Sequence, residues 1–112
     1  MNGDSVGDIQ LTVVTMSFNA APGSADAGTL AAILAKYVVT TRQVANCRNV
    51  DLCGSVTRPG RFLVIEKWAD PDSQRTHFDG PATESLARAC EGLLTVAPDI
   101  DLLDAVSAHD LY

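Results

Sequence analysis

Basic residues are scarce in this chain. Eight lysines and arginines stand against fourteen acidic residues, which leaves a formal net charge of −6 at pH 7. Binding to nucleic acid depends on clustered Lys and Arg side chains, and binding to an anionic membrane surface depends on similar clusters. The two closest basic residues in a turn, Arg58 and Arg61, flank Pro59-Gly60 at a predicted hairpin tip. We therefore expect neither nucleic acid nor a membrane among the partners.

Long apolar runs and paired cysteines are also missing. No apolar stretch approaches the roughly 18 residues of a membrane-spanning helix, and the first eight residues have neither the basic region nor the apolar run of a secretory signal. Cys47, Cys53 and Cys90 form no C-x-x-C pair. Cys47 and Cys53 lie about 20 Å apart in one predicted strand, too far for a disulfide. We expect a cytoplasmic protein whose cysteines are small buried hydrophobic residues in a reducing compartment.

Recognisable cofactor motifs are absent as well. The chain has two histidines, no cysteine spacing typical of a metal site, no G-x-G-x-x-G and no P-loop, so we expect no bound cofactor. Aromatic residues make up 5% of the chain, so a ligand pocket cannot be densely lined by rings. A length of 112 residues with 46% hydrophobic and 20% charged residues predicts one small globular domain.

The first half of the chain predicts a strand followed by a long helix. The stretch from Ile9 to Phe18 is rich in β-branched residues, and Pro22-Gly23 marks a turn after it. Ser24 is a predicted N-cap, and apolar residues at helical spacing predict about five turns of amphipathic helix. The members of this stripe are Leu30, Ile33, Leu34, Tyr37, Val38 and Thr41.

A hairpin and a brief helix are predicted next. Residues 47–56 and 61–68 read as strands, and the short connection at residues 57–60 makes them antiparallel neighbours. Asp70 is a predicted N-cap with Pro71 at the first helical position, where proline is favoured. The brief helix that follows ends at the Asp-Gly-Pro that begins at residue 79.

The last part of the chain completes an α+β pattern. A second helical stretch runs from about Ala82 to Pro98, and residues 99–107 predict a final strand. The order β-α-β-β-α-α-β predicts an antiparallel four-stranded sheet with helices on one face, a ferredoxin-like arrangement. The apolar stripe of the last helical stretch consists of Leu86, Cys90, Leu93, Leu94 and Ala97.

Both faces of the predicted sheet carry apolar residues. Leu63 and Ile65 in the third strand point away from the helices, and Leu11 and Val13 in the first strand repeat the pattern. Helices cover only one face, so burial of the second face requires another sheet. The simplest source is a second copy of the chain related by a twofold axis, and a homodimer is therefore expected.

One strand carries polar side chains where core residues are expected. Alternation along the strand places Glu66 and Trp68 on the same face as Phe62 and Val64. His77 lies one short helix further along the chain. A carboxylate among apolar neighbours must be paired or solvated by a cavity. This group is either a structural anchor or the wall of a pocket.

The motifs around this strand resemble the antibiotic biosynthesis monooxygenase family of small dimeric α+β barrels. The resemblance covers about residues 9–108, between tails at residues 1–8 and 109–112. It implies a ferredoxin-like protomer, a homodimer built face to face through its sheets, and a pocket between sheet and helices. Enzymes of that family oxidise phenolic or quinol-type substrates with O2 and hold no metal or flavin. The matching residues are Pro22-Gly23, Cys47, Pro59-Gly60-Arg61-Phe62, Glu66-x-Trp68 and His77.

The candidate site residues each have two interpretations. His77 is the candidate base, since an imidazole titrates near neutral pH, or it holds the sheet to the helix by hydrogen-bonding Glu66 or backbone. Trp68 is a pocket wall or plain core. Glu66 orients His77 or pairs with a strand-end arginine such as Arg61, and structural use is favoured. Tyr37 needs a partner or a cavity for its hydroxyl.

Further candidates for substrate binding are Arg48 and Phe78. Alternation places Arg48 on the same strand face as Val50 and Leu52, where it either binds an anionic substrate oxygen or is solvated at the strand edge. Phe78 is next to the candidate base in the sequence. His109 is expected in solvent.

Two classes of function follow. The leading hypothesis is a cofactor-independent, O2-dependent monooxygenase that oxidises a small aromatic quinol or polyketide-like phenol. The alternative is a non-catalytic dimeric barrel that binds a small hydrophobic ligand or a partner protein, since this fold hosts many functions. An isomerase acting on a small hydroxy-ketone is a third possibility. Haem degradation is not expected, because residues 82–90 lack the histidine that such relatives use to ligate iron.

Overall fold

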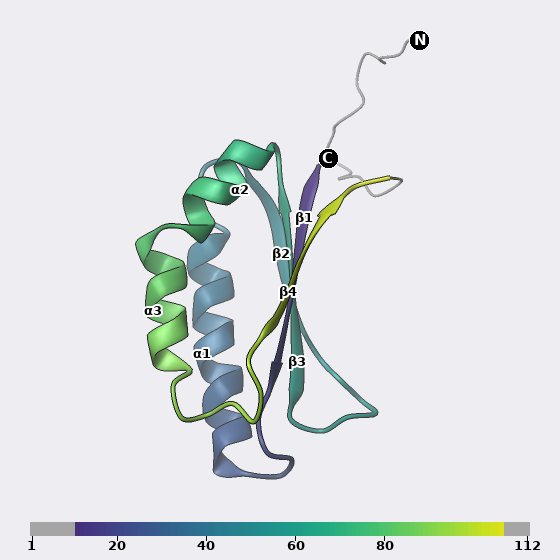
Figure 1. The fold of residues 1–112 in the computed structure, drawn as a ribbon, viewed down its shortest axis with the longest axis vertical. Helices are drawn as coiled ribbons and strands as arrows, with labels where there is room; N and C mark the ends of the chain where they lie inside the picture. Colours follow the sequence, from purple (N-terminus) through teal and green to yellow (C-terminus); the bar gives the residue numbers. More distant parts are fainter. Residues whose placement is uncertain (1–10, 107–112) are drawn as a thin grey trace.

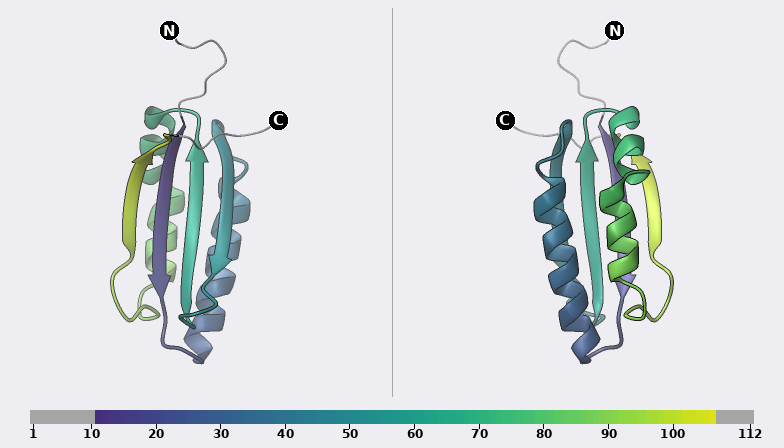
Figure 2. Two further views of the ribbon diagram at one scale, coloured as in Figure 1. Left: turned by 90° about the vertical axis from the view of Figure 1, so that its right-hand side faces the viewer. Right: turned by 90° about the vertical axis from the view of Figure 1, so that its left-hand side faces the viewer.

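The computed structural model describes residues 11–106, which form one four-stranded sheet with three helices on one face (Figures 1 and 2). The strand order is β2-β3-β1-β4, and all neighbours are antiparallel. The predicted element order and the α+β fold class are confirmed. None of the helices within the described range is long and apolar enough to span a bilayer. The elements are β1 (Thr12–Asn19), α1 (Ala25–Thr41), β2 (Cys47–Gly54), β3 (Arg61–Trp68), α2 (Pro71–Phe78), α3 (Pro81–Ala89) and β4 (Asp99–Asp104).

Both predicted N-caps are confirmed. The Ser24 side chain accepts a hydrogen bond from the backbone N–H of Ala27 at 3.2 Å, which begins α1. The Asp70 side chain accepts one from the N–H of Ser73 at 2.7 Å, and Pro71 occupies the first position of α2. These caps place α1 across the sheet and start α2 directly after β3.

The turn between β2 and β3 depends on Gly60. Its φ is +85°, a conformation that side chains rarely adopt, and a Cβ built there would lie 2.4 Å from the carbonyl oxygen of Ala20. The Gly60 carbonyl oxygen also accepts the backbone N–H of Ala20 at 2.9 Å. The hairpin tip is therefore held against the end of β1.

The prediction for the last helical stretch is wrong at its C-terminal end. Helix α3 ends at Ala89, and Gly92 adopts a φ of +80°. A left-handed glycine just beyond a helix ends it, because the chain turns away from the axis. Leu93 and Leu94 lie in the loop that follows, although Leu94 still packs against the core.

Strand β2 is shorter than predicted and interrupted by a bulge. It ends at Gly54, not at residue 56, and its register with β3 shifts between Cys47 and Asn49. The shift pairs Cys47 with Trp68 and breaks the alternation that was expected to place Arg48 in step with Val50.

The cysteines were expected to be buried, but they are not all buried. Cys90 is buried and Cys47 is half-buried, whereas Cys53 is exposed. Cys53 pairs with Leu63 on the sheet face away from the helices, which explains its exposure in a single protomer.

Strand β4 covers residues 99–104, shorter than the predicted 99–107. The start of the predicted first strand at Ile9, the two tails and His109 lie wholly or partly outside the described residues.

The two faces of the sheet differ in their cover. Val14, Val64 and Trp68 point to the helices and are at most 1% exposed. On the other face Leu63 and Ile65 are half-buried without any helix above them (Figure 2, left). The helix layer therefore closes one core and leaves the opposite face uncovered in a single protomer.

Candidate functional site

A buried carboxylate is the centre of a polar cluster between sheet and helices. Glu66 is only 3% exposed. Its Oε2 accepts a hydrogen bond from the hydroxyl of Tyr37 at 2.5 Å, and its Oε1 accepts one from the indole Nε1–H of Trp68 at 2.9 Å. Each carboxylate oxygen thus has a donor, which offsets the cost of burying it.

His77 completes the cluster from the helix side. Its Nε2 lies 3.0 Å from the Tyr37 hydroxyl and 3.5 Å from the hydroxyl of Thr41. Its ring packs on the indole of Trp68 with a centroid distance of 4.9 Å and an interplanar angle of 36°. The imidazole is therefore held by ring contacts with Trp68 and Tyr37 and by two hydroxyl groups.

Three elements supply the cluster. Tyr37 and Thr41 lie four residues apart on α1 and so share one helix face. Glu66 and Trp68 are two residues apart on β3 and so share one sheet face. His77 comes from α2, which the Asp70 cap begins two residues after β3. Sequence spacing alone therefore predicts each pair, and the packing of α1 and α2 on β3 joins them.

Burial changes the acid–base behaviour of two members. Burial raises the pKa of Tyr37, and the nearby charge of Glu66 raises it further, whereas the neighbouring hydroxyl groups of Thr41 and Thr83 lower it. Burial lowers the pKa of His77 below its ordinary value of 6.5, against a smaller upward effect of Glu66. At neutral pH the phenol is therefore protonated and the imidazole is neutral.

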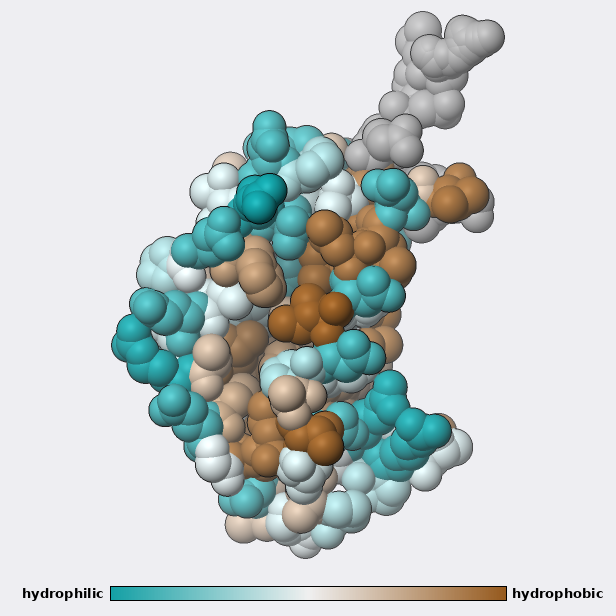
Figure 3. All heavy atoms as spheres, in the orientation of Figure 1, coloured by the Kyte–Doolittle hydropathy of each residue, from teal (hydrophilic) through white to brown (hydrophobic). Residues whose placement is uncertain are grey.

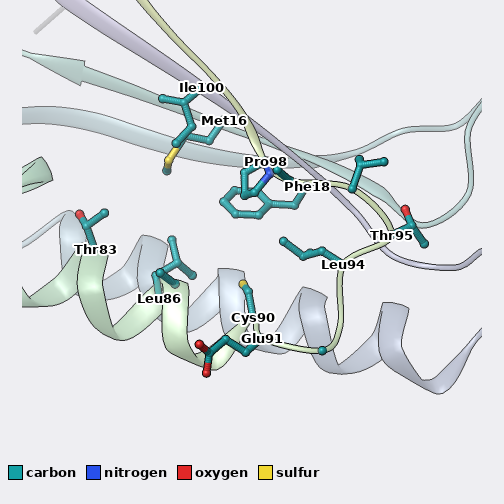
Figure 4. A pocket seen from close by; sticks show the side chains of 14 residues that line it. Met16, Phe18, Thr83, Leu86, Cys90, Glu91, Leu94, Thr95, Pro98 and Ile100 are labelled. Carbon is teal, nitrogen blue, oxygen red and sulfur yellow. The ribbon is translucent and has the colours of Figure 1, made fainter.

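A largely apolar hollow lies between α3 and the sheet (Figure 4). Its volume is about 450 Å³. Phe18 and Met16 of β1 form one side, and Leu86 and Cys90 of α3 form the other. The space-filling view shows apolar side chains gathered on this face of the molecule (Figure 3). A hollow of this size and lining suits a small aromatic body. We call it the α3–sheet hollow.

Two other hollows lie nearby. One, of about 420 Å³, lies between α1 and α3, and Tyr37 is the cluster member that lines it. The other, of about 390 Å³, is lined by residues of α2 and β4 and includes Phe78. Leu86 lines both the α3–sheet hollow and the groove between α1 and α3.

The structure brings four of the six predicted site residues together. Tyr37, Glu66, Trp68 and His77 form the cluster, whereas Phe78 lines the separate hollow beside α2. Arg48 lies at the bulge of β2. Trp68 is fully buried and is not among the residues that line the three hollows.

Two threonines beside the cluster were not predicted as site residues. Thr41 belongs to the apolar stripe of α1, one turn after Tyr37, so its position carried a signal. Thr83 lines the α3–sheet hollow and donates a hydrogen bond from Oγ1 to the carbonyl oxygen of His77 at 3.2 Å. No spacing in the sequence links Thr83 to Tyr37, because the turn between α2 and α3 decides where α3 begins.

Metal ligation has little support in this part of the chain. Within residues 11–106, no three His, Cys, Asp or Glu side chains lie close enough together to hold a metal ion.

Comparisons with known proteins place the fold. The family model described as antibiotic biosynthesis monooxygenase matches residues 12–89. A comparison with curated protein sequences found no significant match.

Solved structures share the whole fold. A Deinococcus radiodurans protein classed as an antibiotic biosynthesis monooxygenase is 22% identical with a TM-score of 0.79, over 90% of this chain and 98% of that chain. Protein NE2512 of Nitrosomonas europaea, described as of unknown function, is 20% identical with a TM-score of 0.80, over 95% and 99%. Protein PA3566 of Pseudomonas aeruginosa is 29% identical with a TM-score of 0.71, over 86% and 93%.

Proposed function

Because this chain belongs to the antibiotic biosynthesis monooxygenase family, we propose that it is a cofactor-independent, O2-dependent monooxygenase. Its substrate is a small aromatic quinol or a polyketide-like phenol. The observation that carries the proposal is a neutral imidazole, His77, held in a buried polar cluster that Thr83 connects to a largely apolar hollow. An imidazole in this state can accept a proton, and the apolar side chains of the hollow can pack against an aromatic ring.

The chemistry needs no external reductant. A deprotonated phenol is electron-rich enough to pass electrons to O2. One oxygen atom then forms a bond to a ring carbon, and the other leaves as water. A phenol becomes a quinone in this way, or a quinol becomes a hydroxyquinone, and all four electrons that reduce O2 come from the substrate. The protein has to supply a base, a hydrogen-bonding partner for the oxyanion and a dry site.

The cluster matches these requirements by role. His77 takes up the substrate proton, and the Glu66 carboxylate stabilises the resulting imidazolium through the hydroxyl of Tyr37. Trp68 packs against the imidazole and donates to Glu66, so it holds both groups in place. In this proposal Trp68 acts through its neighbours, and the walls around the substrate come from Phe18 and the side chains of α3.

Oxygen uptake with a quinol substrate in the presence of a chelator tests the proposal. His77→Ala is expected to lower the rate by about 100-fold or more, the usual contribution of a general base, and Trp68→Phe is expected to lower it less. Arg75→Ala is the matched control on α2, since its side chain is 82% exposed and pairs with Asp79 at the surface. Oxygen uptake at the wild-type rate in the His77 variant contradicts the role of His77.

A homodimer is part of the proposal. Leu63, Ile65 and Leu103 lie on the sheet face that the helices leave uncovered, and a second copy packed on it would remove them from water. Leu63→Glu is expected to yield a protomer in sedimentation at micromolar concentration. Val39→Glu changes an apolar residue that is 58% exposed on α1, and it should leave the dimer intact. A monomeric wild-type chain at that concentration contradicts this assembly.

The structure also favours a second candidate, a non-catalytic barrel that binds a small hydrophobic ligand. The polar atoms of Glu66 and Tyr37 are satisfied inside the cluster, as in a purely structural network. This candidate predicts that an aromatic ligand binds in the α3–sheet hollow while oxygen uptake stays at the background rate. Uptake of one O2 per substrate without release of peroxide favours the monooxygenase.

A further inference from the structure

The α3–sheet hollow has one half-buried polar side chain among largely apolar walls. Of the residues that line it, Thr83, Glu91 and Thr95 carry oxygen in their side chains. Glu91 and Thr95 are exposed, where water competes for their hydrogen bonds, whereas Thr83 is half-buried. Figure 4 shows Thr83 pointing from α3 toward the strand that carries Met16.

The hydrogen bonds of Thr83 determine what it can offer to a ligand. Its hydroxyl donates its single proton to the carbonyl oxygen of His77 at 3.2 Å. What is left is the capacity to accept. A ligand group that pairs with Thr83 must therefore be a donor, such as the O–H of a phenol. A quinone oxygen or an ether oxygen has no proton to give.

Thr83 also lies beside the cluster. Its hydroxyl is close enough to Tyr37 to affect the phenol, and its partner carbonyl belongs to His77. A ligand hydroxyl bound at Thr83 therefore lies at the point where the hollow meets the proton-handling residues.

We propose that Thr83 is the residue that selects ligands with a free hydroxyl in the α3–sheet hollow, by accepting the hydrogen bond of a phenol or quinol. The choice of ligand rests on the proposed function. The selection itself is a binding property, and it favours a hydroxyl-bearing compound over a quinone that carries acceptors only. A site that pairs with a hydroxyl discriminates against an analogue that lacks it, since the Thr83 oxygen, covered by the bound analogue, is then left without a partner.

Three naphthalene derivatives test this selection by calorimetric titration of the whole chain under nitrogen. 1-Naphthol carries the donor, 1-methylnaphthalene has a similar shape without it, and 1,4-naphthoquinone carries acceptors only. The wild-type chain is expected to bind 1-naphthol roughly three- to tenfold more tightly than the other two, the range of one neutral hydrogen bond. Thr83→Val should abolish this preference and leave the affinity for 1-methylnaphthalene unchanged.

Thr95→Val is the matched control. Thr95 lines the same hollow and also donates to a backbone carbonyl, that of Asn19 at 3.3 Å, but it is exposed. This variant should keep the preference for 1-naphthol. Thr83→Ser retains the hydroxyl and should keep it too, which separates lost binding from a folding defect in Thr83→Val.

Two results overturn the inference. One is equal binding of all three ligands by the wild-type chain. The other is an undiminished preference for 1-naphthol in Thr83→Val. The titration needs no turnover, so a chain that never consumes oxygen can still show the selection, and an active oxygenase can fail to show it.

Discussion

The buried carboxylate of Glu66 offers the sharpest test of the cluster. The side chain is 3% exposed and accepts one hydrogen bond from Tyr37 and one from Trp68. Glu66→Leu keeps a similar volume but leaves the buried indole N–H of Trp68 without an acceptor, while the Tyr37 hydroxyl can turn only to Nε2 of His77. An orphaned donor costs about 1–3 kcal/mol and the exchange of a charged for a neutral hydrogen bond costs about 1 kcal/mol more, so this variant is expected to lose roughly 2–4 kcal/mol of unfolding free energy.

Glu66→Gln is the matched variant, because its amide can still satisfy every partner. The amide oxygen accepts from the Trp68 indole, and the amide nitrogen donates to the Tyr37 oxygen. The Tyr37 hydroxyl then turns to donate to Nε2 of His77, 3.0 Å away. Two hydrogen bonds to a charged group become neutral ones, at an expected loss of about 1–2 kcal/mol.

Urea unfolding followed by far-UV circular dichroism measures both losses. Protomer concentration must be equal for all variants, since assembly adds to apparent stability. The Tyr37→Phe variant closes a double-mutant cycle with Glu66→Gln, and a coupling of about 1 kcal/mol or more is expected for groups in direct contact. A Leu variant as stable as the wild type, or less damaging than the Gln variant, would refute the account of this cluster.

Three further predictions concern pH and the backbone. The lowered pKa of His77 means that the unfolded chain binds a proton below pH 6.5 while the folded chain does not. Stability should therefore fall as pH drops from 6.5 toward the lowered pKa of the folded chain. His77→Gln should flatten this part of a plot of urea midpoint against pH, and an unchanged slope would count against the role of His77. Gly60→Ala forces a side chain to a φ of +85° and against the Ala20 carbonyl, so thermal unfolding should show a loss of about 2 kcal/mol or more, and a smaller loss would mean that the hairpin tip can move. Gly28→Ala, at the fourth position of α1 with nothing within 4 Å of the new Cβ, should instead stabilise the chain by about 0.5–1 kcal/mol in the same assay.

Much of the fold was predictable because its signals are local. Ser24 and Asp70 were identifiable as N-caps, since a cap needs only a side chain and the backbone a few residues away. The hairpin turn at residues 57–60 was identifiable from Pro and Gly for the same reason. The error at the end of α3 is also local: the stripe of Leu93 and Leu94 fits a helix, but Gly92 ends it first.

The candidate site was only half predictable. Alternation on β3 placed Glu66 and Trp68 on one face, and helical spacing turned Tyr37 inward. The bulge near Arg48 inserts an extra residue into β2 and so changes which residues of that strand share a face. No local feature of the sequence marks this extra residue.

The sequence by itself determined which residues are inward-facing and where most elements begin. Periodicity and capping depend on residues that are close together in the sequence, so the sequence alone is enough to predict them. Only the tertiary structure decided that Tyr37 joins a carboxylate 29 residues away in sequence to an imidazole 40 residues away, and that Thr83 joins this cluster to the hollow. Those contacts depend on how α1, α2 and α3 pack on the sheet, a balance of long-range packing that no short stretch of sequence encodes.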